Sequence, residues 1–244
     1  MDAVAYRSLR DLQDRHWWFV GRRKIIAKLI TSLIPLQENP RILEAGCGYG
    51  GNLAMLGQFG DLDAFELEDE ARAHAVALAR LPVSCGSLPD QVGFENQSFD
   101  LIAMLDVLEH IDDDVGSLSA LGQRLGTGGS ILLTVPAIPW LWSEHDAIHH
   151  HKRRYTKASL EQVLQQAGFE LVSIGYFNTL LFPLALVQRL ASRLSGRGHS
   201  ADGMPHRLLN SFLSTVFAFE RNLLGRIKFP VGLSLYAVAR LARP

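Results

Sequence analysis

The stretch "RILEAGCGYGGNL", residues 41–53, decides the fold. A short apolar run passes directly into glycines and then into a helical pattern, as where a buried strand turns into a helix. Gly46, Gly48 and Gly50 let the backbone turn sharply and let a ligand approach closely, and the next helix points its N-terminus at that ligand. Their spacing is G-x-G-x-G, not the G-x-G-x-x-G of dinucleotide sites. The preceding acid, Glu44, repels a pyrophosphate but suits an ammonium group, which favours a cationic, amino-acid-bearing ligand over NAD.

Apolar strands and amphipathic helices alternate along the chain on both sides of this stretch. We expect strands at 40–46, 61–67, 82–86, 99–105, 129–136 and 170–177, and helices at 17–33, 52–59, 68–79, 115–125 and 156–168. Such alternation predicts an α/β fold with a doubly wound parallel sheet that binds its ligand at the carboxyl ends of the strands. The 244 residues are interpreted as a single domain with an N-terminal helical cap (1–36), a cofactor-binding core (40–177), a helical lid-like insertion (178–230) and a last strand (231–244).

The composition is typical of a globular protein and gives no sign of nucleic-acid binding. With 48% hydrophobic and 20% charged residues, a sizeable core is expected, and a net charge of −1 gives no field that favours nucleic acid. Two cysteines, no apparent signal peptide and no long apolar run predict a cytoplasmic location. The hydrophobic excess lies in two segments, 178–194 and 206–227, which either cover the sheet or form a lid or a surface for a lipid-like substrate or a membrane.

Four motifs together carry a family resemblance. "RILEAGCGYGGNL", "DAFELEDEARAHA", "SFDLIAMLDVLEHIDDD" and "LGTGGSILLTVP" resemble class I S-adenosylmethionine-dependent methyltransferases in order and spacing, over residues 40–177. The resemblance extends to ubiquinone-biosynthesis O-methyltransferases and to bacterial methyltransferases with "WWF…RR" and "EHD…HKRRYT" stretches. It implies a Rossmann-like sheet of seven strands, mostly parallel with an antiparallel last strand. It also implies S-adenosyl-L-methionine as the cofactor and S-adenosyl-L-homocysteine as its product.

The resemblance assigns the cofactor site residue by residue. Glu44 and Gly46 would lie near the methionine moiety, Glu66 would hold the ribose hydroxyls, and Leu67 would pack on the adenine. The chain has no acid after the third strand, so Ser87 and the Leu88 backbone would bind the adenine amino group. The full expected set is Trp18, Arg22, Arg23, Glu44, Gly46, Cys47, Gly48, Gly50, Glu66, Leu67, Ser87, Leu88, Asp106 and Val107. Arg22 and Arg23 either meet the cofactor carboxylate or belong to a solvated helix face.

Methyl transfer from a sulfonium depends mostly on alignment, but an oxygen acceptor of high pKa also needs a base or a metal. The stretch "DVLEH" offers His110 as the base. Two alternatives stay open there: Glu109 and His110 cap and orient the loop, or Asp106, Glu109 and His110 bind a divalent cation, as has been proposed for quinone-pathway relatives. No metal is expected, and residues 112–114, "DDD", are interpreted as a helix cap.

The stretch "WSEHDAIHHHKRRY", residues 142–155, follows the fifth expected strand and so lies over the same edge of the sheet. Its "HDAIH" differs from the H-E-x-x-H of zinc proteases in the acid and lacks a third ligand, so it is interpreted as an acceptor wall. His145 and Asp146 would act together as a general base, and Tyr155 would orient the acceptor. Lys152, Arg153 and Arg154 would bind an anion, or the stretch is only a solvated basic turn. The expected catalytic residues are therefore His110, His145, Asp146 and Tyr155.

The sequence thus predicts a methyltransferase acting on a small or lipid-linked acceptor, on oxygen. Two other classes stay open: a non-catalytic S-adenosylmethionine-binding module that regulates a partner enzyme, and an NAD-dependent oxidoreductase. No nucleic-acid partner is expected. Peripheral membrane contact through residues 178–230 is the alternative to a purely cytoplasmic location.

Overall fold

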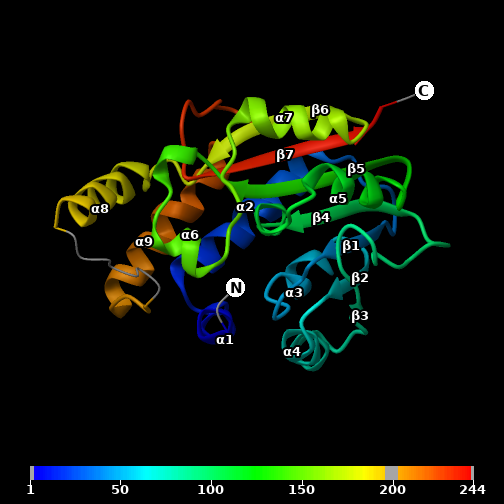
Figure 1. Ribbon diagram of the computed structural model, residues 1–244, viewed down its shortest axis with the longest axis horizontal. Coiled ribbons are helices and arrows are strands. Elements are labelled where there is room, and N and C mark those ends of the chain that lie inside the picture. Colours follow the sequence, from blue (N-terminus) through cyan, green and yellow to red (C-terminus); the bar gives the residue numbers. More distant parts are fainter. Residues whose placement is uncertain (1–2, 196–202, 243–244) are drawn as a thin grey trace.

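One mixed sheet in the order β3-β2-β1-β4-β5-β7-β6 organises the computed structural model, which describes residues 3–195 and 203–242 (Figure 1). The strands are β1 (Arg41–Ala45), β2 (Asp61–Glu66), β3 (Ser84–Cys85), β4 (Phe99–Leu105), β5 (Leu125–Pro136), β6 (Phe169–Phe177) and β7 (Ser234–Leu241). β1 to β5 pair in parallel, and β7 runs antiparallel between β5 and β6. The predicted doubly wound sheet of seven strands with an antiparallel last strand is confirmed.

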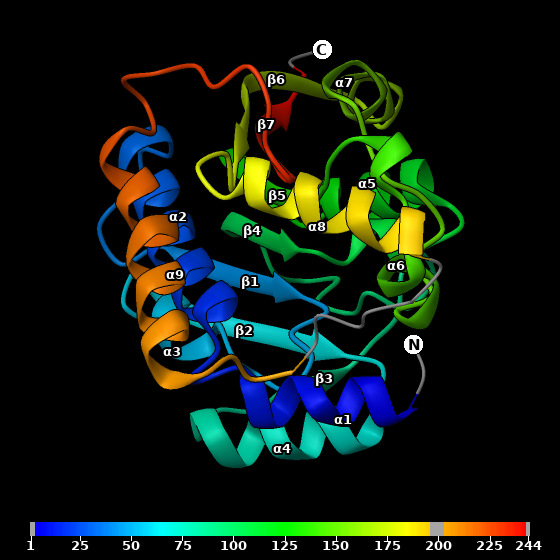
Figure 2. The ribbon, with the colours of Figure 1, turned by 90° about the vertical axis from the view of Figure 1, so that its left-hand side faces the viewer.

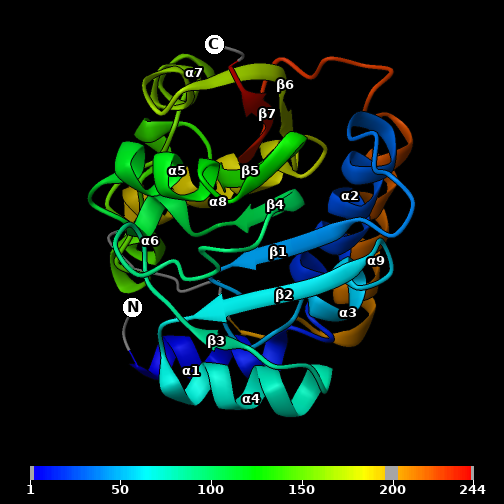
Figure 3. The ribbon, with the colours of Figure 1, turned by 90° about the vertical axis from the view of Figure 1, so that its right-hand side faces the viewer.

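Helices cover both faces of this sheet (Figure 3). The α-helices are α1 (Ala3–Leu12), α2 (Trp17–Leu33), α3 (Leu53–Leu56), α4 (Asp69–Ala79), α5 (Asp114–Gly122), α6 (Glu144–Ile148), α7 (Lys157–Gln166), α8 (Phe182–Ser195) and α9 (Arg207–Phe219). Short 3-10 turns lie at Leu108–His110, Pro139–Leu141 and Glu220–Asn222. Ile42 packs with α2 and α9, while its neighbour Leu43 packs with α5 and α7. Successive strand residues point to opposite faces, so each face of the sheet has its own core.

Several helix boundaries differ from the sequence-based expectation; α8 begins only at Phe182 and α9 already ends at Phe219. α5 begins at Asp114 because the Asp113 side chain caps it, accepting a hydrogen bond of 2.8 Å from the Gly116 amide. It ends at Gly122, because Leu125 already pairs with Phe99 at the start of β5. α3 is a short helix that continues as turns, and α1 is an additional helix within the expected N-terminal cap.

The glycine loop after β1 has the backbone that the sequence requires. Gly46, Gly48 and Gly50 have φ angles of +70°, +56° and +84°, in the left-handed region that favours glycine. A Cβ on Gly50 would also lie 3.0 Å from the Cα of Ala75 on α4. The loop can therefore bring its amide groups close to a ligand, and no other residue type fits there without strain.

The 178–230 segment contributes α8, which lines the cavity side of the molecule, and α9, which runs alongside α2 on one face of the sheet (Figure 2). α9 packs against α2, where Asn210 accepts a hydrogen bond of 2.8 Å from the Trp17 amide and Phe217 covers Gly21. Within the described residues, every helix is too short or too polar to cross a bilayer.

Candidate functional site

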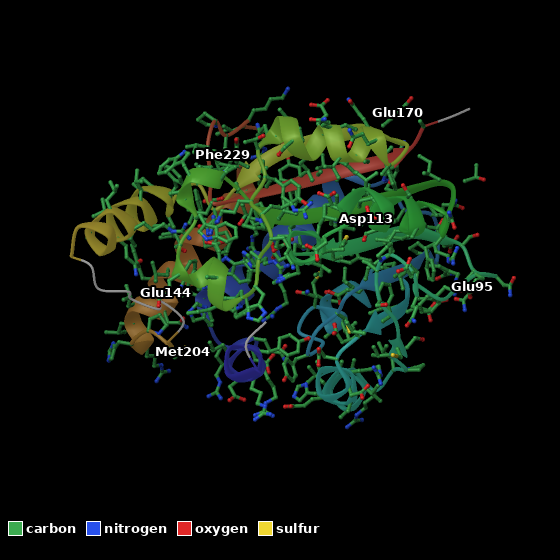
Figure 4. All side chains as sticks on the ribbon, viewed as in Figure 1. Glu95, Asp113, Glu144, Glu170, Met204 and Phe229 are labelled. Atoms are coloured by element: carbon green, nitrogen blue, oxygen red, sulfur yellow. The ribbon has the colours of Figure 1, made fainter. Side chains whose placement is uncertain are left out.

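A cavity of about 1460 Å³ opens at the carboxyl ends of the strands. Its walls come from α1 and α2, the glycine loop, the residues after β2 and β4, α6, and α8; Glu144, at the start of α6, is labelled on this rim in Figure 4. The expected cofactor residues that line it are Trp18, Arg22, Arg23, Gly46, Cys47, Gly48, Glu66, Leu67, Ser87, Leu88, Asp106 and Val107. Glu44 and Gly50 lie directly behind this wall, so the structure brings the expected set together.

Glu66 ends β2 and forms one side of the cofactor half. Its buried carboxylate accepts hydrogen bonds from the Gly48 amide at 2.7 Å and the Glu68 amide at 3.0 Å. The Tyr6 hydroxyl from α1 also contacts it, and burial together with this carboxylate raises the pKa of Tyr6. Leu67 beside it keeps 56% of its surface exposed. A carboxylate next to an exposed leucine is an arrangement that can bind the ribose and the base of a nucleoside.

Glu44 lies at the end of β1, completely buried, and one carboxylate oxygen accepts a hydrogen bond of 2.8 Å from the Asn52 side chain. The other oxygen, Oε2, is buried without a hydrogen-bond partner in the described part of the chain. Burial raises the pKa of Glu44 to about 7. An adjacent cation stabilises the ionised form of a buried carboxyl. The ammonium group of an amino-acid moiety is such a cation.

The two arginines of α2 have different partners. Arg22 is buried, forms an ion pair with Asp106 at the end of β4, and lies 4.9 Å from the centre of the Trp18 ring. Arg23 donates to the main-chain carbonyls of Gln13 at 2.7 Å and Gly51 at 3.2 Å. Both line the cavity, so the alternative of a purely solvated helix face is wrong.

The opposite half of the cavity holds a cluster of histidines from two segments. His110 follows β4, whereas His145, His149 and His151 come from α6 and the turn after it; all four line the cavity. The ring centres of His110 and His151 are 4.7 Å apart, and those of His145 and His149 are 4.2 Å apart. Burial first, and then the neighbouring His151, lowers the pKa of His110 to about 3, so this imidazole is neutral at physiological pH.

Asp146 organises this cluster, but its histidine partner is His151 and not the expected His145. It is fully buried, and its Oδ1 lies 2.9 Å from His151 Nδ1. Arg154 donates to both carboxylate oxygens, at 2.7 and 3.0 Å. Burial alone would raise the pKa of Asp146, but the hydrogen bonds from His151 and Arg154 outweigh it and hold the pKa well below its usual range. Ser143 and Asp146 also form a capping box, a spacing visible in the sequence that would have shown Asp146 turning inward.

The other expected acceptor contacts lie away from the cavity. Arg153 pairs with Asp114 at 2.7 Å, Lys152 pairs with Asp112 at 3.2 Å, and the buried Tyr155 hydroxyl donates to Asp114 at 2.9 Å. These three side chains fasten the turn after α6 to the start of α5. Arg154 does line the cavity, but Asp146 holds its guanidinium. The geometry therefore gives no support to an anion site made of Lys152, Arg153 and Arg154, or to a catalytic Tyr155.

Three potential metal ligands do converge in the histidine half. Glu109, His110 and His151 each offer one ligand atom, and these atoms lie within 4.8 Å of one another. Glu109 is buried and its Oε2 is without a hydrogen-bond partner in the described residues, while burial and the nearby Asp106 raise its pKa. His151, which the sequence did not single out, joins Glu109 and His110 here, whereas Asp106 pairs with Arg22.

Comparison with known proteins identifies the family of this chain. The methyltransferase domain family matches residues 19–174. A ubiquinone biosynthesis O-methyltransferase of Xanthomonas euvesicatoria pv. vesicatoria is 28% identical over 172 residues, which cover 63% of this chain and 71% of that protein. A probable S-adenosylmethionine-dependent methyltransferase of Mycolicibacterium smegmatis is 24% identical over 177 residues, covering 70% and 67% of the two chains.

Solved structures share the fold. The putative methyltransferase in complex with the Trm112 methyltransferase activator of Haloferax volcanii aligns with a TM-score of 0.63 at 18% identity, over 99% of this chain and 96% of that one. Phosphoethanolamine N-methyltransferase 2 of Haemonchus contortus, in complex with S-adenosyl-L-methionine, aligns with a TM-score of 0.58 at 18% identity, over 96% and 60% of the two chains. With the glycine loop, Glu66 and the family match in agreement, the chain belongs to the methyltransferase domain family and is an S-adenosylmethionine-dependent methyltransferase.

Proposed function

We propose that this methyltransferase transfers the methyl group to an oxygen atom of a small amphiphilic or lipid-linked acceptor. The observation that carries the proposal is the His151–Asp146 pair: His151 lines the cavity, and the buried Asp146 carboxylate lies 2.9 Å from its Nδ1. A histidine oriented by a buried carboxylate is a typical general base. Such a base is needed when the nucleophile is a hydroxyl, and much less so when it is already an anion.

The proposed step is an in-line displacement. The acceptor oxygen attacks the methyl carbon, the carbon–sulfur bond breaks, and its electron pair stays on sulfur, which converts the sulfonium into S-adenosyl-L-homocysteine. The acceptor proton passes to Nε2 of His151, whose Nδ1–H donates to Asp146. Arg154, held against Asp146 at 2.7 Å, keeps that carboxylate ionised. His110, whose lowered pKa makes it a weak base, stays neutral beside His151 and can orient the acceptor.

The size and walls of the cavity support an amphiphilic acceptor. About 1460 Å³ exceeds the usual 300–1,000 Å³ range of ligand sites and leaves room beside a nucleoside cofactor. α8 contributes Ala185, Gln188 and Arg189 to the wall, while Leu184 and Val187 on the same helix are exposed. A polar head can thus lie near the histidines while an apolar tail follows α8. Peripheral membrane association is part of this proposal.

A divalent cation is a second candidate for activating the acceptor, and the unpartnered Oε2 of Glu109 favours it. One carboxylate and two imidazoles suit zinc or a similar ion, and Asp146 would orient His151 from behind, as carboxylates commonly do for metal-bound histidines. Glu109, His110 and His151 would hold the ion, which would lower the pKa of the acceptor hydroxyl. The expectation from the sequence that no metal is bound therefore stays a prediction.

Transfer of tritium from methyl-labelled S-adenosyl-L-methionine to a total lipid extract, compared with the aqueous extract, tests the acceptor class. His151→Asn should lower the labelling rate by about 10²–10⁴-fold while calorimetry shows unchanged S-adenosyl-L-homocysteine affinity. Exposed Lys152→Gln is the control. Full labelling by His151→Asn would refute the base, and absence of acceptor labelling by the wild type in either extract would favour the non-catalytic regulatory module. Loss of labelling in chelator, restored by zinc, would assign activation to the cation.

A further inference from the structure

The outer faces of α8 and α9 form an apolar surface, which we define by their exposed large side chains. These are Leu184, Val187 and Leu190 on α8, and Leu208, Leu209, Phe212 and Phe219 on α9. Leu208 and Phe212, one helical turn apart, expose 76% and 62% of their surface. Figure 2 shows both helices on the same side of the molecule. Several exposed large apolar side chains on two helices of one side mark an interaction surface, since single exposed leucines are common but grouped ones are not.

Cations border the α9 end of this surface. Lys28 on α2 and Arg221 and Arg226 after α9 line a second hollow of about 410 Å³, and exposed Lys228 follows. Among the described residues, no carboxylate pairs with any of these four cations. The residues lining the hollow include no acid. The combination of exposed apolar side chains with neighbouring cations is typical of protein surfaces that adsorb to anionic membranes.

The charge of the whole segment is also one-sided. Residues 178–230 contain seven Lys or Arg and two Asp or Glu, although the chain as a whole has a net charge of −1. The described acid of the segment, Glu220, is buried and accepts a hydrogen bond of 2.6 Å from the Leu180 amide, which ties the end of α9 to the approach of α8. Among the described residues of the segment, the acid is therefore turned inward, whereas Arg221, Arg226 and Lys228 are exposed.

We infer that the α8–α9 face is a docking surface for an anionic phospholipid bilayer. Leu184, Val187, Leu208 and Phe212 would enter the headgroup–acyl boundary, and the hollow of Lys28, Arg221 and Arg226 would take lipid phosphates. α8 has one face on the cavity and the opposite face in this surface. Docking thus places the cavity beside the bilayer, where a lipid-linked acceptor can enter sideways. Entry of the acceptor rests on the proposed function; docking gives its membrane association a location and does not depend on methyl transfer or on the acceptor.

Electrostatics favours a bilayer over a second copy of the chain as the occupant. A two-fold contact between copies places the same patch of each copy against its mate. Lys28, Arg221, Arg226 and Lys228 of both copies would then gather at one interface, which is unfavourable without counter-charges. An anionic bilayer supplies those counter-charges and also buries the apolar side chains.

Vesicle co-sedimentation of the full chain tests the inference, with phosphatidylcholine vesicles made with and without phosphatidylglycerol. Binding is expected only with phosphatidylglycerol and should weaken as salt is added. Joint replacement Arg221→Gln, Arg226→Gln and Lys228→Gln should weaken binding on the order of 100-fold, at roughly fivefold per cation. Leu208→Ser with Phe212→Ser should weaken it roughly tenfold. Leu78→Ser and Arg80→Gln on and after α4, both exposed, are the matched controls and should bind as the wild type.

Each result separates this inference from the proposed function. Because all replaced side chains are exposed, circular dichroism and S-adenosyl-L-homocysteine titration should be unchanged in every variant. Absence of wild-type binding to phosphatidylglycerol vesicles, or equal binding by the variants, overturns the docking surface and leaves methyl transfer untouched. A wild-type dimer in light scattering that Phe212→Ser converts to a monomer would assign the face to a second copy and overturn it as well. Docking without acceptor labelling would refute the proposed function alone.

Discussion

Asp146 offers the sharpest test of how the acceptor half is built. It is fully buried and accepts hydrogen bonds from two guanidinium nitrogens of Arg154, Nε and Nη2, from His151 and from the Ser143 amide. Asp146→Asn removes the charge but keeps the shape, and leaves the buried Arg154 without an anion. Breaking a buried ion pair in this way costs about 3–5 kcal/mol. We expect a loss of that size in the free energy of unfolding, measured by urea denaturation at neutral pH.

A double variant separates the effect of an unpaired buried charge from the effect of losing the hydrogen bonds of Asp146. Asp146→Leu combined with Arg154→Met removes both charges, and the Ser143 amide then loses its acceptor, which costs about 1–3 kcal/mol. The double variant should therefore be more stable than Asp146→Asn alone. His151 loses its orienting carboxylate in either variant, so methyl transfer should fall while S-adenosyl-L-homocysteine binding persists. A change below about 0.5 kcal/mol in Asp146→Asn, the usual range for surface sites, would refute the buried pair.

Three further outcomes follow from the cofactor half and the helix packing. Glu66→Gln should weaken S-adenosyl-L-homocysteine about 10–100-fold by calorimetry, since hydrogen bonds to a charged group contribute about 1.5–3 kcal/mol; unchanged affinity would remove Glu66 from the ribose site. Because burial raises the pKa of Glu44 from 4.5 to about 7, its folded carboxyl holds a proton that a cofactor ammonium expels, so affinity should rise from pH 6 to 7.5 with proton release. Glu44→Gln should abolish both effects, which calorimetry in buffers of different ionisation enthalpy measures. Gly21→Ala should destabilise the fold by about 1–3 kcal/mol, because its Cβ would lie 2.5 Å from Phe217, and Phe217→Leu should restore part of the loss in the same denaturation assay.

The cofactor half could be predicted well because its constraints are local. The turn after β1 needs glycines at three alternate positions with positive φ angles, Gly46, Gly48 and Gly50, and the acid ending β2 lies at a fixed distance along the chain. Both signals are readable in a single stretch of sequence. The bounds of α2, Trp17–Leu33, were likewise predicted to the residue, because Pro35 ends a helical apolar pattern there.

The acceptor half could not be predicted in the same way, because its contacts follow neither helical nor strand periodicity. Some join residues five to eight positions apart across the turn after α6, and others join segments some forty residues apart. Neighbours in sequence, His145 and Asp146 lie on different sides of α6, and the capping box turns the aspartate inward toward His151 and Arg154. Lys152 and Arg153 looked available for an anion, yet acids some forty residues earlier hold them.

The sequence by itself therefore determined the doubly wound sheet, the glycine loop, and the identity of the cofactor. Only the tertiary structure decided which histidine meets Asp146, that Glu109 and His110 converge with His151, and that α8 separates the cavity from an exposed apolar surface. Hydrophobic periodicity and turn-forming residues act over a few positions, so they can be recognised in the sequence. The pairing of Asp146 with His151 depends on how the turn after α6 folds back, and pairings about forty residues apart depend on how the sheet brings its loops together.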